Sequence, residues 1–175
     1  MQTLTCPIPN NINPLQSNGF MFAINKLPEV TFFCQEVEIP SMSLPAAQAA
    51  TPLSDLFMSG DKIEFSELNI TFLIDENMNN YKAIYDWMVG LGKPADTEQY
   101  AAFMRRDVMA SGDATRSSSD GVLQVLGSSN NQVRVVTFRD LVPVSLQSLQ
   151  LQSTTTDTQY LAGSATFRYT LYEFA

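Results

Sequence analysis

The sequence predicts a mainly β fold in which a closed or nearly closed antiparallel sheet carries one α-helix on its side. Apolar and polar residues alternate through about seven short segments, which is typical of strands with one buried face. One segment, about Asn79 to Leu91, instead repeats its apolar residues every three or four positions, the spacing of an amphipathic helix. With 175 residues and a hydrophobic content of 45%, the chain is expected to form a single domain with its own core.

The elements before residue 40 are expected to begin with an extended arm. Residues 1–17 are rich in Pro and Asn, a composition that disfavours packed elements. Alternation over Phe20–Ile24 predicts a first strand, and Leu27-Pro28-Glu29 predicts the turn after it. A second strand is expected over Val30–Ile39, with a bulge near Gln35 because the apolar residues change face there.

A long apolar connection follows from Ser41 to Gly60 and carries few charges. Structureless loops of this length are rare in compact domains unless they have a function. An exposed apolar surface of this kind is also costly in a monomer. We therefore predict that the connection is buried on an adjacent subunit or ring through four residues, Leu53, Leu56, Phe57 and Met58.

The segment Lys62–Ile74 gives the clearest strand pattern in the chain. A change of phase at Ser66 and Glu67 predicts a second bulge within it. Asp75 and Glu76 come directly before the predicted helix. Adjacent acids in this place fit N-terminal capping and a favourable interaction with the helix dipole better than they fit a general acid and base.

The second half of the chain is expected to return to β structure after an insertion at about 98–120. Within the insertion, Glu98–Met109 predicts a short helix and Ser111–Asp120 predicts a flexible loop. Strand patterns then follow in chain order: Val122–Leu126, Val133–Phe138 after a hairpin turn at Gly127–Asn131, Leu141–Gln152 with a break near Gln147, and a terminal strand through Ala165, Phe167, Tyr169 and Leu171.

The acidic residues are concentrated in the first half of the chain. Nine Asp or Glu residues occur in the first 80 positions against only Lys26 and Lys62, and the whole chain has a net charge of -8. Nucleic-acid binding depends on Lys and Arg displacing counterions from phosphates, so this balance argues against a protein that grips DNA. It is compatible with a negative wall past which a polyanion slides, and also with charge that only keeps the protein soluble.

The sequence indicates no catalytic, cofactor-binding or metal-binding residues. Histidine is absent, which excludes a Ser-His-Asp triad within the chain. The glycines form no phosphate-binding loop, and Cys6 and Cys34 match no zinc or redox spacing. Glu64 and Glu67 flank the second predicted bulge and fit solvent-facing charge better than a metal site. With no signal peptide and no apolar run of membrane-spanning length in the sequence, we expect a cytoplasmically made protein without a membrane anchor.

Three stretches, taken in their order, carry a family resemblance. They are Phe32-Phe33-Cys34-Gln35 with Ile39-Pro40-Ser41; Ser59-Gly60-Asp61-Lys62 followed by a strand, Asp75-Glu76 and the helix with Trp87; and the terminal Thr166-Phe167-Arg168-Tyr169-Thr170-Leu171-Tyr172-Glu173. Over about residues 19–91 and 120–175, this order and these distances resemble the tail tube family of contractile-tailed bacteriophages, which includes tube-like baseplate proteins. The Asn- and Pro-rich opening and the 98–120 insertion depart from that pattern.

The resemblance implies two packed antiparallel sheets, a tail-tube-like β-sandwich or barrel, with one flanking α-helix. It further implies hexameric rings that stack into a tube for DNA and the tape measure protein, with tail sheath and baseplate proteins as partners. The protein would then be a non-enzymatic virion component that is assembled in the host cytoplasm. On this reading Glu64, Glu67, Asp75 and Glu76 are channel-facing or capping acids.

The sequence leaves three alternatives to the repeating tube subunit. The first is a tube-initiating or adaptor ring of the baseplate. The second is a monomeric β-sandwich that binds a carbohydrate or peptide at its Tyr-rich end. An enzyme is the third, and the absence of histidine argues against it. Oligomeric state separates the first two, because a persistent monomer at high concentration would favour the binding module.

Overall fold

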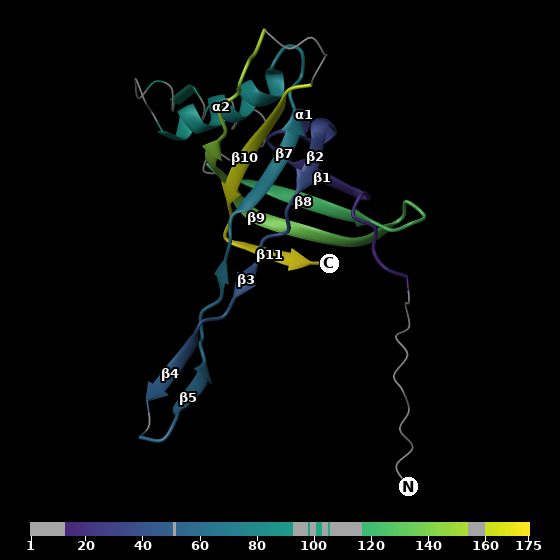
Figure 1. Ribbon diagram of the computed structural model, residues 1–175. Helices are drawn as coiled ribbons and strands as arrows, with labels where there is room; N and C mark the ends of the chain where they lie inside the picture. The colour runs from purple at the N-terminus through teal and green to yellow at the C-terminus, as the bar shows by residue number, and fades with distance from the viewer. Residues whose placement is uncertain are drawn as a thin grey trace.

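The computed structural model describes residues 13–50, 52–92, 98, 101, 102, 105, 117–153 and 160–175. Within this part the elements are, in chain order, β1 (Phe20–Ile24), α1 (Pro28–Phe33), β2 (Cys34–Val37), β3 (Met42–Ser43), β4 (Ala46–Ala50), β5 (Asp55–Ser59), β6 (Glu64–Phe65), β7 (Leu68–Leu73), α2 (Asn79–Gly92), β8 (Ser119–Leu126), β9 (Gln132–Leu146), β10 (Ala162–Arg168) and β11 (Leu171–Phe174) (Figure 1).

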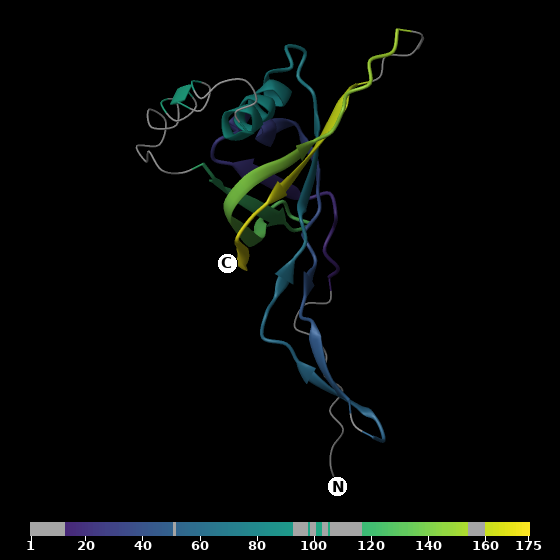
Figure 2. The ribbon, with the colours of Figure 1, turned by 90° about the vertical axis from the view of Figure 1, so that its left-hand side faces the viewer.

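The body of the molecule is one antiparallel sheet that folds into two packed layers. Its strands lie in the order β1-β8-β9-β10-β7-β2, and β11 pairs with β9 beside this path. The long strand β9 belongs to both layers, because its first part pairs with β8 and β11 and its last part pairs with β10. Figure 2 shows β9 curving from one layer into the other. The predicted arrangement of two packed antiparallel sheets with a flanking helix is confirmed.

The core lies between the two layers, where alternate residues of each strand point inward. The most deeply buried apolar side chains come from both layers and from the two helices: Phe22, Val30, Leu68, Ile70, Phe72, Ile84, Val136, Phe138, Leu141, Ala165 and Phe167. Phe22 and Phe138 meet edge to face at 6.3 Å between ring centroids, a favoured geometry for aromatic pairs. Trp87 of α2 is 3% exposed and belongs to the core.

Helix α2 is attached to the end of β7 by a buried amide. The Asn80 side chain is 1% exposed, its Nδ2 donates to the Leu73 carbonyl at 2.7 Å, and its Oδ1 accepts from the backbone N–H of Asp75 and of Tyr81. A buried polar group is stabilising only when its hydrogen bonds are made, and this one has them. The predicted helix is confirmed to within one residue at its end.

The prediction of a strand over Val30–Ile39 is wrong in its first part. The structure has α1 over Pro28–Phe33, and the strand β2 begins only at Cys34. Pro28 stands at the first helical turn, where its fixed φ angle favours a helix and its missing N–H costs nothing. Val30 is buried while Phe32 is 85% exposed, whereas two residues at this spacing in a strand would lie on the same face. The bulge predicted near Gln35 is confirmed, since the pairing of β2 with β7 shifts register between Cys34 and Glu36.

Two strand boundaries in the second half also differ from the prediction. The segments predicted as Val133–Phe138 and Leu141–Gln152 are one strand, β9, that ends at Leu146. Asp140 has a φ of 57° within β9, so the side chains change face there. The sequence pattern changes phase at the same place, and this change predicted two separate strands. The terminal segment, predicted as one strand, is broken at Tyr169 and Thr170 into β10 and β11.

The turn predicted between β8 and β9 is confirmed: the Asn130 N–H donates to the Gly127 carbonyl, and the Gly127 N–H donates to the Asn131 carbonyl. The loop predicted over Ser111–Asp120 is wrong at its end, because Ser119 and Asp120 already belong to β8. Of the helix predicted over Glu98–Met109, Glu98, Ala101, Ala102 and Arg105 are helical. The remainder of that helix, residues 111–116 of the loop and residues 1–12 of the N-terminal arm lie outside the described residues.

Candidate functional site

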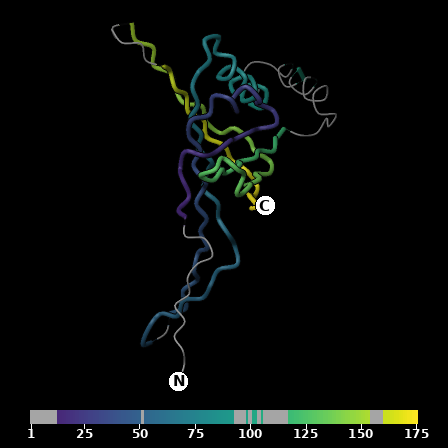
Figure 3. The backbone as a smooth tube through the Cα atoms, turned by 90° about the vertical axis from the view of Figure 1, so that its right-hand side faces the viewer, coloured from purple at the N-terminus to yellow at the C-terminus, as the bar shows by residue number. Residues whose placement is uncertain are grey.

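The segment between β2 and β7 projects from the body as a long hairpin, residues 42–65. Strands β4 and β5 pair along their whole length, from Ala46 with Ser59 to Ala50 with Asp55. In three views the hairpin extends well beyond the sandwich (Figure 1, Figure 2, Figure 3). The expected irregular connection at Ser41–Gly60 is thus largely regular, because its backbone groups pair with each other across the hairpin.

The long hairpin carries the four residues predicted as an inter-subunit contact. Leu53 is 99% exposed, Leu56 57%, Phe57 68% and Met58 53%. Several large apolar side chains exposed together on one element are typical of an interaction surface. The prediction that another subunit buries them stays a prediction.

The register of the hairpin separates its side chains onto two different faces. Residues paired directly across an antiparallel ladder share a face, and successive residues alternate between faces. Ala47 pairs with Met58 and Ala49 pairs with Leu56, so one face is wholly apolar. We call these four residues the apolar face. Phe57 lies on the other face opposite Gln48, together with Asp55 and Ser59.

A second set of exposed apolar side chains lies at the opposite end of the molecule. The described residues between β9 and β10 run away from the sheet on the side opposite the long hairpin (Figure 1, Figure 2). Leu151 is 79% exposed and Tyr160 is 84% exposed in this connection. The two ends of the molecule therefore both present apolar groups to solvent, and sequence reasoning identified only one of them.

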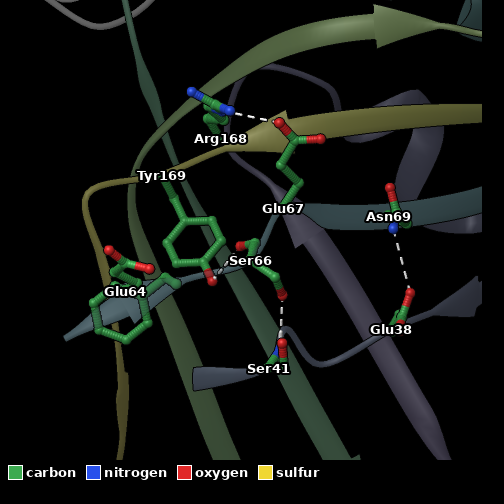
Figure 4. Close-up of a pocket in the computed structure, with 9 residues that line it drawn as sticks. Glu38, Ser41, Glu64, Ser66, Glu67, Asn69, Arg168 and Tyr169 are labelled. Atoms are coloured by element: carbon green, nitrogen blue, oxygen red, sulfur yellow. Dashed lines mark hydrogen bonds and ion pairs between the residues drawn. The ribbon is translucent and has the colours of Figure 1, made fainter. Parts of the chain in front are cut away.

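The root of the long hairpin forms an open cleft between its two legs and the sheet (Figure 4). Its lining residues come from β6, β7, β10 and the segments around them: Glu38, Ser41, Glu64, Phe65, Ser66, Glu67, Asn69, Arg168 and Tyr169. The Arg168 Nε donates to Glu67 Oε1 at 2.9 Å, and Asn69 Nδ2 donates to Glu38 Oε2 at 3.3 Å. The Arg168 and Glu67 side chains are exposed enough for water to screen their ion pair, so the pair stabilises the fold by about 1 kcal/mol or less.

The structure separates the four predicted acids into two places. Glu64 and Glu67 line the cleft at the hairpin root. Asp75 and Glu76 precede α2, where Asp75 Oδ2 accepts a hydrogen bond from Asn79 Nδ2 at 3.3 Å. That contact ties Asp75 to the side chain of the first helical residue. Whether any of the four faces a channel stays a prediction.

Two tyrosines at the hairpin root were missed as functional residues by sequence reasoning. The Tyr169 hydroxyl donates to the Ser66 carbonyl at 2.9 Å, and the Tyr172 hydroxyl donates to the Pro40 carbonyl at 3.3 Å. Burial, with the neighbouring Tyr172 as a smaller cause, raises the pKa of Tyr169 from 10.0 to about 12. Tyr169 therefore keeps its proton, and can donate, over the whole physiological range. The aromatic terminal strand was the available signal, but sequence alone did not show what it contacts.

Three further properties of the described residues bear on function: the reactivity of a thiol, metal binding and the length of the helices. Cys34 is a free, half-buried thiol, and burial raises its pKa from 9.0 to about 11, which makes it a poor nucleophile near neutral pH. Among the described residues no group of His, Cys, Asp and Glu is arranged to hold a metal ion. The helices in that same part of the chain are too short or too polar to cross a membrane.

The comparisons with known proteins agree with the fold. Residues 3–175 match the family model described as phage tail tube protein. This chain therefore belongs to the phage tail tube protein family, and the resemblance read from the sequence is confirmed. The search of curated proteins found no match.

Several solved structures share the fold at low sequence identity. The tube-terminating cap of the anti-feeding prophage is 10% identical, with 99% of each chain covered and a TM-score of 0.65. The sheath/tube terminator of an extracellular contractile injection system, PVC, in its extended state is 11% identical, with 93% of this chain and 97% of that chain covered and a TM-score of 0.62. The anti-feeding prophage baseplate contains a chain that is 15% identical, with 93% and 96% covered and a TM-score of 0.60.

Proposed function

We propose that this chain is a non-enzymatic structural subunit of a contractile phage tail, a single tail-tube-like domain that forms hexameric rings. The rings would stack into the tail tube, a conduit for DNA and the tape measure protein. The observation that carries the proposal is the long hairpin, which exposes Leu53, Leu56, Phe57 and Met58 on a member of the tail tube family. A monomer gains nothing from exposing these side chains, whereas a neighbouring copy would remove them from water.

Stacking of rings is supported by the two exposed apolar ends. The long hairpin projects from one end of the molecule, and Leu151 and Tyr160 are exposed at the other. A contact between two different surfaces of identical copies can repeat along an axis when it does not close into a ring, and a stack of rings requires such a contact. The partners would be further copies of this chain, tail sheath and baseplate proteins.

Lateral contact within a ring is supported by open sheet edges. In the part of the chain that the structure describes, strands β1 and β2 end the path of the sheet, and β11 pairs with β9 on one side. An edge strand presents unpaired backbone groups that can pair with another chain, and ring closure satisfies them. The acidic first half of the chain, with nine acids in 80 residues, would let DNA pass without specific binding. The virion would be the final location, after assembly in the host cytoplasm.

A tube-initiating or adaptor ring of the baseplate is the alternative. The fold is shared with chains from a baseplate and from two tube-terminating assemblies as well as with the tube family. Electron microscopy of the purified protein separates the two candidates. Long tubes support the repeating subunit, and single rings that do not stack support the baseplate ring. A monomer at high concentration would contradict both and favour a binding module.

The role of the long hairpin is tested by Leu56→Asp combined with Phe57→Asp. This pair places one charge on each face of the hairpin, and burying either carboxylate against an apolar partner is strongly unfavourable. We expect the variant to lose ring or tube formation while keeping the wild-type far-ultraviolet circular dichroism spectrum. Intact tubes from this variant would contradict the proposed contact.

A further inference from the structure

The long hairpin leaves the body and returns to it at a single place, so its direction is set at its root. The leaving leg is Pro40–Ser43 and the returning leg is Glu64–Glu67. The two legs are tied to each other by pairing of β3 with β6 and by two hydrogen bonds between Ser41 and Ser66, at 3.0 and 2.8 Å. These bonds hold the hairpin together. They do not fix its angle to the sandwich.

In the described part of the chain, the hydrogen bonds that join the legs to the body come from one corner of the sheet, Arg168–Tyr172, where β10 ends and β11 begins. The Tyr169 hydroxyl donates to the Ser66 carbonyl on the returning leg, at 2.9 Å. The Tyr172 hydroxyl donates to the Pro40 carbonyl on the leaving leg, at 3.3 Å. Figure 4 shows Tyr169 reaching Ser66, with the ion pair of Arg168 and Glu67 beside it.

The same two tyrosine rings hold the side chain of Phe65. Its ring lies 6.0 Å from Tyr169 and 5.4 Å from Tyr172, and both tyrosines stack in turn on Phe138 of the core, at 5.3 and 5.8 Å. The aromatic contacts thus run without a gap from the buried core to the last residue of the hairpin. Packed rings resist rotation because any tilt opens a space that nothing fills.

We propose that Tyr169 and Tyr172 are positioning residues for assembly, which fix the direction of the long hairpin and so aim its apolar face at a second copy of this chain. The first part rests on these hydrogen bonds and ring contacts, and the second part rests on the proposed function. A single anchor would act as a pivot, whereas two anchors on two legs oppose rotation about either one. The strands β4 and β5 are exposed or half-exposed throughout, so the direction of the hairpin depends on the contacts at its root.

The test measures the distance between the hairpin and the body directly. Spin labels are placed at Gln48→Cys on β4 and Ser129→Cys in the exposed turn after β8, in a background with Cys6→Ser and Cys34→Ser. Labelled chain is diluted with unlabelled chain, so that each distance lies within one copy whatever the assembly state. The variant is Tyr169→Phe with Tyr172→Phe, which keeps the rings and removes only the hydroxyls.

A matched control is Tyr81→Phe. The Tyr81 hydroxyl also donates to a backbone carbonyl, that of Gln147 at 3.2 Å, but it lies on α2 and away from the hairpin. Loss of one typical hydrogen bond changes the ratio of loosened to fixed hairpin by about fivefold. Loss of both root bonds should therefore raise this ratio by roughly twentyfold or more. We expect a broad distance distribution in the double variant and a narrow one in both the wild type and Tyr81→Phe.

A narrow distribution in the double variant would overturn the inference, and so would equal broadening in Tyr81→Phe. Should the double variant fold poorly, Tyr172→Phe alone, which keeps the shorter bond of Tyr169, serves the same comparison. Tube or ring yield at fixed concentration is the second readout. Broadened distances with unchanged yield would refute the assembly role of the tyrosines. Unchanged yield from Leu56→Asp with Phe57→Asp would instead refute the proposed contact and leave the distance result standing.

Discussion

The sandwich body buries many of its large apolar side chains, whereas the long hairpin exposes most of its own. In the body, the large apolar residues point between two layers and several are fully buried, whereas in the hairpin Leu53, Leu56, Phe57 and Met58 are each more than half exposed. The core of the body is therefore formed within one chain. The hairpin is complete as a ladder of hydrogen bonds but incomplete as a packed structure. If the proposed function holds, stability and assembly depend on different residues, and substitutions can separate the two.

The largest expected effect contrasts two phenylalanines that lie in the two regions. Phe138 is 0% exposed and contacts Phe22 and Tyr169, while Phe57 is 68% exposed on the hairpin. Phe138→Ala should lower the free energy of unfolding by about 3–5 kcal/mol, because it removes buried surface and leaves a cavity. Phe57→Ala should change it by about 0.5 kcal/mol or less. Urea denaturation of the two variants measures both values, and similar losses would erase the distinction between body and hairpin.

A smaller effect is expected where a polar group lies inside the body. Asn80→Ala leaves the Leu73 carbonyl and two backbone N–H groups without their partner, and should lower the free energy of unfolding by about 1–3 kcal/mol. Asn79→Ala is the control, because this neighbour is exposed and bonds only an exposed carboxylate among the contacts described. Equal effects of the two substitutions in thermal denaturation would show that the buried amide does not hold α2 to β7.

The smallest expected effect is a dependence of stability on alkaline pH at the hairpin root. The folded state holds the proton of Tyr169 up to a pKa of about 12, while the unfolded chain releases it near the ordinary value of 10.0. Above pH 10 the unfolded state therefore binds fewer protons, and the free energy of unfolding falls as pH rises toward 12. Cys34, with its pKa raised from 9.0 to about 11, adds a fall of the same sign that begins lower.

Tyr169→Phe removes one of these two titrating groups. The decline in stability between pH 10 and 12 should become shallower in this variant, whatever its stability at neutral pH. Chemical denaturation at several alkaline pH values measures the slope. An unchanged slope would mean that Tyr169 holds its proton no more tightly in the folded protein than in the unfolded chain.

Alternation and helical spacing predicted the body well because its strands have one buried face. The strand at β7, the helix α2, the bulge beside Gln35 and the turn at Gly127–Asn131 were all readable in this way. The pattern failed at α1, because alternation predicted one strand face for Val30 and Phe32, whereas the short helix buries the first and exposes the second. It also failed in β9, where the positive φ of Asp140 changes the face without ending the strand.

The candidate site was readable in part. An apolar run with few charges indicated that Ser41–Gly60 has a function, but not that β4 and β5 pair or that Leu56 and Met58 share a face with two alanines. Cross-strand register depends on which residues meet, and the prolines and alanines of this segment show no alternation. The contacts of Tyr169 and Tyr172 could not be predicted for a similar reason, since Tyr172 and Pro40 lie 132 positions apart and only the fold brings them together.

The central claim, that the long hairpin is buried on another copy of the chain, is tested most directly by oxidation of Met58 with a solvent-borne oxidant. Met58 is 53% exposed on the apolar face, and oxidation rates of methionine follow access of the reagent to sulfur. Mass spectrometry compares the rate at Met58 in dispersed protein and in purified rings or tubes. We expect strong protection of Met58 on assembly, and equal rates in the two states would show that another copy does not bury this face of the hairpin.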